Sequence, residues 1–204
     1  MIYLYSGTPG SGKSLHMARV IYYTLMRNKP VICNFDVNTK YLKHADKFTC
    51  IDNSSLNPEY LIQYSMDYFK DKSVREGQIT LFIDECQTMF NARSWDTRGR
   101  ENWNKFFQLH RHYGYDIVLV AQFDRMIDRQ IRSLIEYEVI HRKVSNMGWR
   151  GKLLCALMLA PKLFTSVKIW YPMKERVGSE MFRASRRYYR LYDTYMTLAA
   201  LEEK

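Results

Sequence analysis

Short apolar runs of four or five residues recur along the first two thirds of the chain and alternate with longer segments whose apolar residues repeat every three to four positions. The short runs predict strands, and the longer segments predict helices. The expected strands are residues 2–5, 31–35, 79–83, 116–120 and 137–140, and the expected helices are residues 15–27, 58–70, 103–112 and 128–135. Strands that alternate with helices are typical of a mostly parallel sheet flanked by helices on both faces, so we predict an α/β fold.

The pattern changes after residue 144. Residues 150–171 contain two apolar runs interrupted by Pro161, which predicts a β-hairpin, and residues 178–195 are rich in arginine and aromatic residues. We therefore divide the chain into an α/β core at residues 1–144 and a small basic, aromatic-rich C-terminal appendage at residues 145–204. With 47% hydrophobic residues, a chain of 204 residues can bury one substantial core.

The segment between the first strand and the first helix fits the phosphate-binding pattern G-x-x-x-x-G-K-[ST]. It reads Gly7, Thr8, Pro9, Gly10, Ser11, Gly12, Lys13 and Ser14, and Leu15, the next residue of the helix, is included in the expected nucleotide-binding segment. Glycines let successive backbone N–H groups turn around a phosphate, and the helix N-terminus adds partial positive charge. Lys13 is expected to reach the β- and γ-phosphates of ATP, and Ser14 to hold Mg²⁺ through its hydroxyl. The sequence therefore predicts a P-loop NTPase, and a chance glycine-rich turn before Lys-Ser is the weaker alternative.

The predicted strand 79–83 ends in Asp84 and Glu85, which is the form of a Walker B element. Asp84 is expected to bind Mg²⁺ opposite Ser14, directly or through water, and Glu85 to activate the attacking water as general base. A surface acidic turn is the alternative, and the upstream phosphate loop makes it weaker. A second carboxylate beside the metal-binding one favours hydrolysis over nucleotide binding alone.

Two further polar positions complete the predicted machinery. Gln122 follows the strand 116–120 and is expected to sense the γ-phosphate or orient water, with an ordinary turn residue as the alternative. Arg111 precedes that strand and is the favoured candidate for stabilising transition-state charge on a neighbouring subunit's nucleotide, although a single arginine is more often a surface residue. The other candidate arginines are Arg93, Arg98, Arg100, Arg125 and Arg132.

Composition bears on three further properties, namely metal binding, membrane spanning and cellular location. Cys33, Cys50, Cys86 and Cys155 are widely spaced, and the five histidines lack metal-ligand spacing, so we expect reduced thiols and no cysteine or histidine metal site. No run of eighteen apolar residues occurs, so we do not expect this chain to span a bilayer. Met1 leads directly into the first expected strand, so we do not expect a signal peptide. These features predict a cytoplasmic location, where ATP and Mg²⁺ are available.

The net charge of +10 is concentrated in one span. Residues 141–190 contain twelve Lys or Arg residues and two Glu residues, which accounts for all of it. This asymmetry suggests a face for an anionic partner, either nucleic acid or the inner leaflet of a membrane, and a basic surface that only aids solubility is the third interpretation. No nucleic-acid recognition motif accompanies the charge, so the three stay open.

Together these motifs resemble the filamentous-phage assembly ATPases, which are grouped with the zonula occludens toxin (Zot) family. The resemblance rests on residues 7–14, 84–95, 110–116 and 128–132 and on the strand that ends in Gln122. It implies a cytoplasmic ATPase domain, distantly similar to DNA-pumping ATPases, that acts as a homo-multimer and powers virion assembly and export through the bacterial inner membrane. Full-length members of the family are expected to be anchored in this membrane by a helix, and we do not find that helix in these 204 residues. The toxin activity in the family name is associated with a distal segment and is not carried over.

We therefore expect a Mg²⁺-dependent ATPase motor for filamentous-phage assembly, whose partners are copies of itself, phage coat or packaging proteins and the membrane export apparatus. A DNA translocase or packaging ATPase is the second hypothesis, because the basic span 141–190 is suited to contact phosphates. A nucleotide-gated interaction module with negligible turnover is the third. The phosphate loop does not distinguish ATP from GTP, since it contacts phosphates and not the base.

Overall fold

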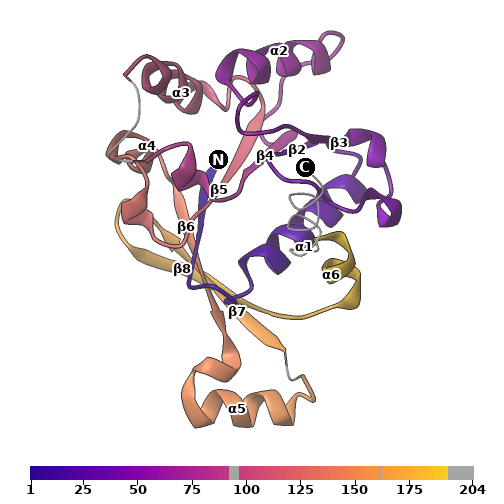
Figure 1. Ribbon diagram of the computed structural model, residues 1–204, viewed down its shortest axis with the longest axis vertical. Coiled ribbons are helices and arrows are strands. Elements are labelled where there is room, and N and C mark those ends of the chain that lie inside the picture. Colours follow the sequence, from indigo (N-terminus) through magenta and orange to yellow (C-terminus); the bar gives the residue numbers. More distant parts are fainter. Residues whose placement is uncertain (92–96, 161, 193–204) are drawn as a thin grey trace, which may run out of the picture.

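The computed structural model describes residues 1–91, 97–160 and 162–192 (Figure 1). Its strands are β1 (Ile2–Ser6), β2 (Val31–Cys33), β3 (Phe48–Cys50), β4 (Ile79–Ile83), β5 (Tyr115–Val120), β6 (Tyr137–Lys143), β7 (Leu163–Trp170) and β8 (Glu175–Arg183). Its helices are α1 (Lys13–Met26), α2 (Pro58–Tyr68), α3 (Thr97–Leu109), α4 (Arg129–Ser133), α5 (Gly148–Leu157) and α6 (Arg186–Leu191).

The strands form one eight-stranded sheet in the order β3-β2-β4-β5-β1-β6-β7-β8. The strands from β3 to β6 in this order pair in parallel, whereas β7 pairs antiparallel with both β6 and β8. Because β5 lies between β1 and β4, the segments that follow these three strands meet at one edge of the sheet. We call this edge the carboxyl edge. Ligands of open parallel sheets bind at such an edge.

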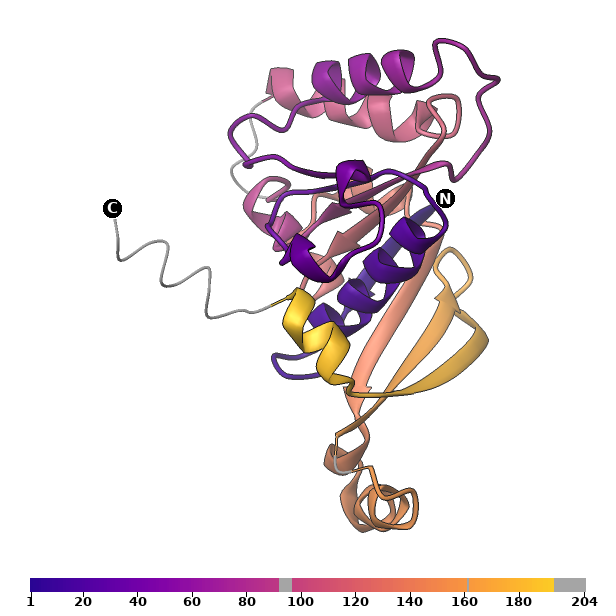
Figure 2. The same cartoon turned by 90° about the vertical axis from the view of Figure 1, so that its right-hand side faces the viewer.

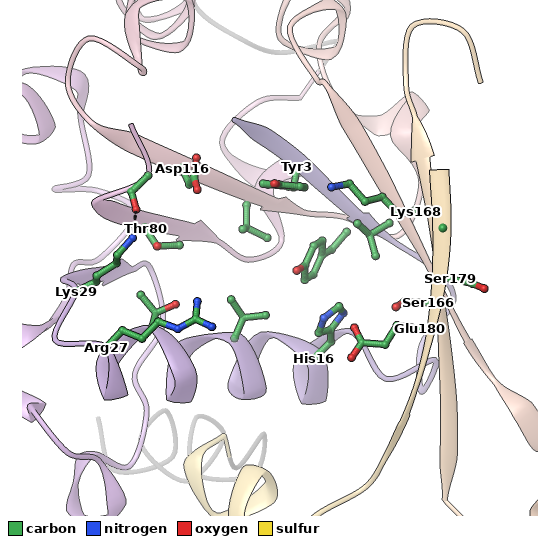
Figure 3. Close-up of a pocket in the computed structure, with 17 residues that line it drawn as sticks. Tyr3, His16, Arg27, Lys29, Thr80, Asp116, Ser166, Lys168, Ser179 and Glu180 are labelled. Carbon is green, nitrogen blue, oxygen red and sulfur yellow. Dashed lines mark hydrogen bonds between the residues drawn. The ribbon is translucent and has the colours of Figure 1, made fainter. Parts of the chain in front are cut away.

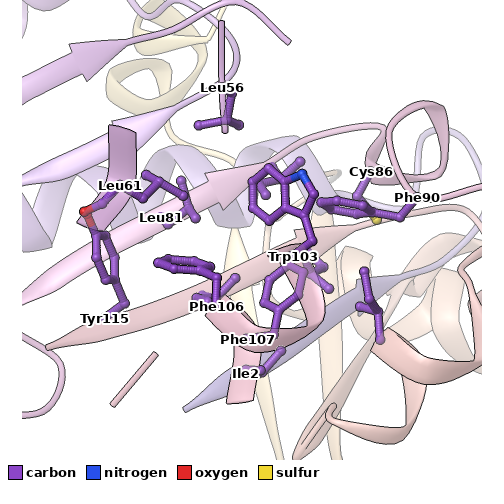
Figure 4. Packing of buried hydrophobic residues seen from close by; sticks show 14 of the residues in the cluster. Ile2, Leu56, Leu61, Leu81, Cys86, Phe90, Trp103, Phe106, Phe107 and Tyr115 are labelled. Atoms are coloured by element: carbon purple, nitrogen blue, oxygen red, sulfur yellow. The ribbon is translucent and has the colours of Figure 1, made fainter. Parts of the chain in front are cut away.

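Helices cover both faces of the sheet, and alternate residues of each strand contribute to one face or the other. On one face, Leu81 and Ile117 pack with aromatic residues of α3, among them Trp103, Phe106 and Phe107 (Figure 4). On the opposite face, Phe82 and Val118 pack against α1. The sheet therefore separates two apolar layers. The short helix α6 lies against α1 on the second face (Figure 2).

The structure confirms all nine expected elements, most within three residues of the predicted bounds, but α3 begins six residues before the predicted start at residue 103. Asn57 caps α2 by accepting from the backbone N–H of Tyr60, with Pro58 in the first turn. The sequence interpretation did not identify β3, which has only three residues and carries no buried side chain. The predicted α/β class, with a mostly parallel sheet flanked by helices, is therefore correct.

The C-terminal region differs from the expectation for residues 150–171. Its first apolar run forms the helix α5 instead of a strand, and the hairpin consists of β7 and β8, one run further along the chain. Apolar runs of this length do not distinguish a strand from a helix. The hairpin is hydrogen-bonded to β6 and extends the central sheet, so the predicted boundary at residue 144 falls between adjacent strands of one sheet.

Candidate nucleotide-binding site

The phosphate loop connects β1 to α1 at the carboxyl edge of the sheet. Gly7 and Gly12 both have left-handed backbone conformations, with φ of 140° and 98°. A Cβ on Gly7 would lie 2.6 Å from the carbonyl oxygen of His141, and one on Gly12 would lie 2.5 Å from the ring of Phe164. Both positions therefore require glycine for conformation and for space. The tip of the loop, residues 8–10, is exposed, so the loop is open to a ligand.

The Lys13 side chain lies within this loop. Its ammonium group donates to the carbonyl oxygen of Gly7 at 2.5 Å and to that of Thr8 at 3.3 Å. Burial lowers the pKa of Lys13, and the negative charges of Asp84 and Glu85 partly offset this effect. Lys13 follows β1, and the two acids follow β4, so the fold places both motifs at the carboxyl edge of the sheet.

Asp84 is held in place by side chains from distant parts of the chain. The Asn34 side chain accepts from the backbone N–H of Asp84 at 2.7 Å and donates to its carbonyl oxygen at 2.9 Å. The Tyr192 hydroxyl donates to Oδ2 of Asp84 at 2.9 Å. Burial raises the pKa of Asp84, while the hydrogen bonds from Tyr192 and from the backbone N–H of Glu85 oppose that rise. The carboxylate is thus desolvated and directionally fixed.

Glu85 has a left-handed backbone, with φ of 46°, which is uncommon for a residue other than glycine and is concentrated at functional sites. Its side chain accepts a hydrogen bond from the side-chain amide of Gln87, which lies in a short 3₁₀ turn just after it. Thr88 Oγ1 donates to the carbonyl oxygen of Glu85 at 2.9 Å. These contacts orient an exposed carboxylate beside the half-buried Asp84.

Gln122 is the second residue after β5, the strand that lies between the two motif strands β1 and β4. Its carbonyl oxygen accepts from the backbone N–H of Gly7 at 3.3 Å, which ties the end of β5 to the start of the phosphate loop. A cavity of about 600 Å³ opens beside them, within the size range of small-molecule sites. Its lining includes Gly7, Thr8, Ser11 and Gln122 together with residues of β6.

Ser14 and Asp84 supply oxygen donors, a hydroxyl and a carboxylate, of the kind that Mg²⁺ prefers. Ser14 lies in the first turn of α1, and Asp84 directly follows β4. No group of three or more His, Cys, Asp or Glu side chains in the described part of the chain is arranged to hold a metal ion by itself. A magnesium site here would therefore need oxygens from the nucleotide or water, as is usual for this ion.

Arg111 lies away from the other predicted site residues. Its guanidinium donates to Oε2 of Glu136 at 2.6 Å, and Glu136 in turn accepts from the backbone N–H of Ile2. Ile2 opens β1 and Glu136 directly precedes β6, so Arg111 lies at the amino edge of the sheet, opposite the phosphate loop. Its predicted role at a neighbouring subunit's nucleotide stays a prediction. Among the other candidates, Arg93 lies outside the described residues, and Arg100 pairs with Asp128 at 3.5 Å.

A second cavity, of about 490 Å³, runs along α1 between the helix and the sheet (Figure 3). Its lining includes His16 and Glu180 but none of the predicted site residues. Just beside it, Nδ1 of His16 lies 2.7 Å from Nε2 of His141, which links α1 to β6 behind the phosphate loop. Burial lowers the pKa of His16 to about 4 and that of His141 to about 3, so both rings are neutral at pH 7.

Three residues at the site have no signal in the sequence. Asn34 and Tyr192 reach Asp84 from 50 and 108 positions away, and no short motif encodes such contacts. Gln87 is only two residues from Glu85, but the sequence does not reveal that the turn after Glu85 brings the Gln87 side-chain amide back to the Glu85 carboxylate. Among the described residues, no helix combines the length and the apolar character that crossing a membrane requires.

Comparison with known proteins places this geometry in a family. Residues 1–197 match the family profile described as Zonular occludens toxin (Zot). The Gene 1 protein of Enterobacteria phage fd is 26% identical over 147 residues, which cover 69% of this chain but only 41% of that protein. The chain thus corresponds to less than half the length of this relative.

Solved structures agree on the fold. The N-terminal domain of zonular occludens toxin from Neisseria meningitidis superposes with a TM-score of 0.58 at 20% identity, over 94% of this chain and 98% of that one. The genome packaging NTPase B204 from Sulfolobus turreted icosahedral virus 2, in complex with ATP-gammaS, gives 0.54 at 15% identity, over 89% and 96%. Because the family profile covers nearly the whole sequence and the P-loop NTPase fold matches these structures, the chain belongs to the Zot family.

Proposed function

We propose that this chain is a Mg²⁺-dependent ATPase whose hydrolysis cycle drives filamentous-phage assembly and export at the bacterial inner membrane. The observation that carries the proposal is the arrangement of Lys13, Asp84 and Glu85 at one edge of the sheet. Similarity to the Gene 1 protein of a filamentous phage and to a viral packaging NTPase supports the choice of process. Copies of this chain, phage coat or packaging proteins and the export apparatus are the proposed partners.

Each residue has a distinct role in the proposed mechanism. The loop backbone from Gly7 to Ser14 and the positive end of α1 bind the phosphates, and Lys13 neutralises their charge. Ser14 and Asp84 would hold Mg²⁺, which supplies further neutralisation of the phosphate oxygens. Glu85 accepts a proton from the attacking water, because it is the carboxylate left free of the metal role. Gln122 orients that water at the tip of β5.

The test is steady-state ATP hydrolysis at several protein concentrations. Glu85→Gln is expected to keep nucleotide binding and lose turnover by about 10²- to 10⁴-fold, the range of general acid–base catalysis. Lys13→Ala is expected to lose binding and turnover together. Glu101→Gln, which removes an exposed carboxylate on α3, is the matched control and should behave as the unmodified chain. Hydrolysis that persists in Lys13→Ala or Glu85→Gln would refute the assignment.

A DNA translocase or packaging ATPase is the second candidate, favoured by the basic span 141–190 and by the structural similarity to the packaging NTPase. It predicts that DNA stimulates hydrolysis and that the stimulation falls steeply with salt, because phosphate contacts release counterions. Turnover per subunit that rises with protein concentration and does not respond to DNA favours the assembly motor. Nucleotide binding without measurable turnover at any concentration favours a nucleotide-gated interaction module.

A further inference from the structure

The helix α5 projects from the body of the molecule beyond the carboxyl edge of the sheet (Figures 1 and 2). One side of it is well packed. Gly151 and Cys155 are buried, and Cys155 contacts Val144 and Leu163 at the base of the projection. A Cβ on Gly151 would lie 2.0 Å from the carbonyl oxygen of Val144, so the helix rests directly on backbone there. This close contact fixes which side of α5 faces away from the protein.

The outward side of α5 is apolar. Trp149, Leu153 and Leu157 recur every four residues and therefore share one face of the helix. Trp149 is 70% exposed and Leu157 is 79% exposed, and Leu159, just past the helix, is 89% exposed. Large apolar side chains gathered on one exposed surface mark an interaction site, whereas scattered ones do not. We call this surface, residues 149, 153, 157 and 159, the α5 face.

The surroundings of the α5 face are exclusively basic. From residue 142 to residue 162, the segment that contains α5 and its two connections to the sheet, the sequence has five Lys or Arg residues and no Asp or Glu. Arg150 and Lys152 are exposed on α5 itself, and the Arg150 guanidinium lies 5.6 Å from the centre of the Trp149 ring. Tryptophan and leucine on one side of a helix, with Lys or Arg and no acid alongside, are typical of helices that lie in the headgroup region of anionic bilayers.

We propose that α5 docks on the surface of an anionic phospholipid bilayer. In this arrangement Trp149, Leu153 and Leu157 enter the boundary between headgroups and acyl chains, and Arg150 and Lys152 contact lipid phosphates. The helix lies in the plane of the surface and does not cross it, because its ten residues are too few to span a bilayer. The inference goes beyond ATP hydrolysis and depends on none of the residues assigned to it.

A lipid surface explains the α5 face better than the other anionic partners. Nucleic acid would use the basic side chains but would leave three or four large aliphatic and aromatic groups in water. A protein partner would cover the apolar groups, yet it would need a complementary acidic rim to match the five basic residues of this segment. An anionic bilayer accounts for both features with one partner, since its phosphates are anionic and its acyl chains are apolar.

The experiment is vesicle flotation with the full chain. Vesicles of phosphatidylglycerol and phosphatidylcholine are compared with vesicles of phosphatidylcholine alone, at 150 mM and 500 mM salt. We expect binding to the anionic vesicles, weakened by salt, and a loss of at least tenfold in the partition coefficient for the Leu153→Gln/Leu157→Gln double variant. Arg150→Gln/Lys152→Gln should lose a similar factor on anionic vesicles only. In addition, the Trp149 fluorescence, obtained as the difference from Trp149→Phe, should shift to the blue.

Met66→Gln is the matched control, because Met66 is an exposed apolar residue on α2, away from the α5 face. It should bind vesicles as the unmodified chain does. Equal binding of the Leu153→Gln/Leu157→Gln variant and the unmodified chain would overturn the proposal. The proposal would also be overturned if the chain did not bind vesicles but associated with itself in solution, and if these substitutions abolished that association. The α5 face would then be a contact between copies of the chain. No nucleotide is present, so failure here leaves the proposed ATPase untouched.

Discussion

Asp84 owes its position at the site to Asn34, a residue that follows a different strand. The two hydrogen bonds that Asn34 exchanges with the backbone of Asp84 act as a clamp between the ends of β2 and β4. The same side-chain amide also donates to Oδ1 of Asn53 at 2.8 Å. Asn34 is thus a positioning residue, since it touches Asp84, the residue proposed to bind Mg²⁺, and none of the proposed reacting groups.

Asn34→Ala is expected to leave the backbone N–H and carbonyl groups of Asp84 without these partners. The cost of unpaired polar groups is about 1–3 kcal/mol, so the melting temperature should fall and the Mg²⁺ concentration for half-maximal turnover should rise several-fold. Asn53→Ala is the control, because it removes only the outer hydrogen bond. A loss of stability without a change in Mg²⁺ dependence would limit Asn34 to a structural role.

The neutral pair of His16 and His141 makes stability depend on pH. Their pKa values in the folded chain, about 4 and about 3, lie below the ordinary value of 6.5, so the unfolded chain binds more protons between pH 6.5 and pH 4. Stability is therefore fully present above pH 6.5 and is lost as the pH falls. At pH 5 the loss is about 2 kcal/mol per histidine by proton linkage.

Urea unfolding at pH 7.5, 6.5 and 5.0 measures this dependence. His141→Gln should flatten the slope of the unfolding free energy against pH in this window, whatever its effect on absolute stability. His112→Gln, at an exposed position, should leave the slope unchanged. Parallel slopes in all three proteins would rule out the buried pair as the cause.

At the scale of elements, the sequence predicts what local patterns determine. The strands β1, β4 and β5 consist of short apolar runs, and a motif residue follows each, so both the elements and the identities of Lys13, Asp84 and Gln122 could be inferred. The adjacency of these strands needs the sheet order, which no single segment encodes. The prediction of a hairpin at residues 150–171 is wrong because α5 is apolar on both its buried and its exposed side and so lacks a helical period.

The helix α6 brings a tyrosine to the site from the far end of the chain. It packs on α1, where Arg187 donates to the hydroxyl of Tyr22 at 3.2 Å, and Leu191 is buried. The ring of Tyr192, just after the helix, packs against Phe35 with centroids 5.1 Å apart. The position of α6 thus places the Tyr192 hydroxyl on Oδ2 of Asp84, the residue proposed to bind Mg²⁺.

Tyr192→Phe keeps the ring on Phe35 and removes only the hydroxyl. If this hydroxyl and Mg²⁺ compete for the same carboxylate oxygen, the variant should need about ten- to hundredfold less Mg²⁺ for half-maximal ATP turnover, as expected for one hydrogen bond to a charged group. Tyr189→Phe is the control on the exposed side of α6. A higher Mg²⁺ requirement in Tyr192→Phe would instead assign Tyr192 to orienting Asp84.

At the scale of the whole molecule, Arg111 and the phosphate loop lie at opposite edges of the sheet. If Arg111 completes a neighbour's site, Arg111→Ala should lose turnover and keep nucleotide affinity. Mixing Arg111→Ala with Lys13→Ala should then restore part of the activity. Where the two variants meet, an Arg111→Ala subunit supplies an intact phosphate loop and a Lys13→Ala neighbour supplies an intact Arg111.

Glu136→Gln separates this role from simple stabilisation. It weakens the ion pair with Arg111 while both side chains keep their size. If the ion pair alone matters, Glu136→Gln should reproduce the defect of Arg111→Ala, and mixing with Lys13→Ala should restore nothing. Turnover per subunit, measured against the ratio of the two variants, distinguishes these outcomes.

The ammonium group of Lys13 is already paired with two carbonyl oxygens of its own loop. When a phosphate binds, the ammonium group exchanges these carbonyl oxygens for phosphate oxygens. The contribution of Lys13 to nucleotide affinity is therefore the difference in free energy between the two sets of hydrogen bonds. Removing the ammonium group also removes two contacts that shape the loop. The loss of nucleotide binding in Lys13→Ala therefore contains a conformational part, and amide hydrogen exchange in residues 7–12 without nucleotide would measure that part separately.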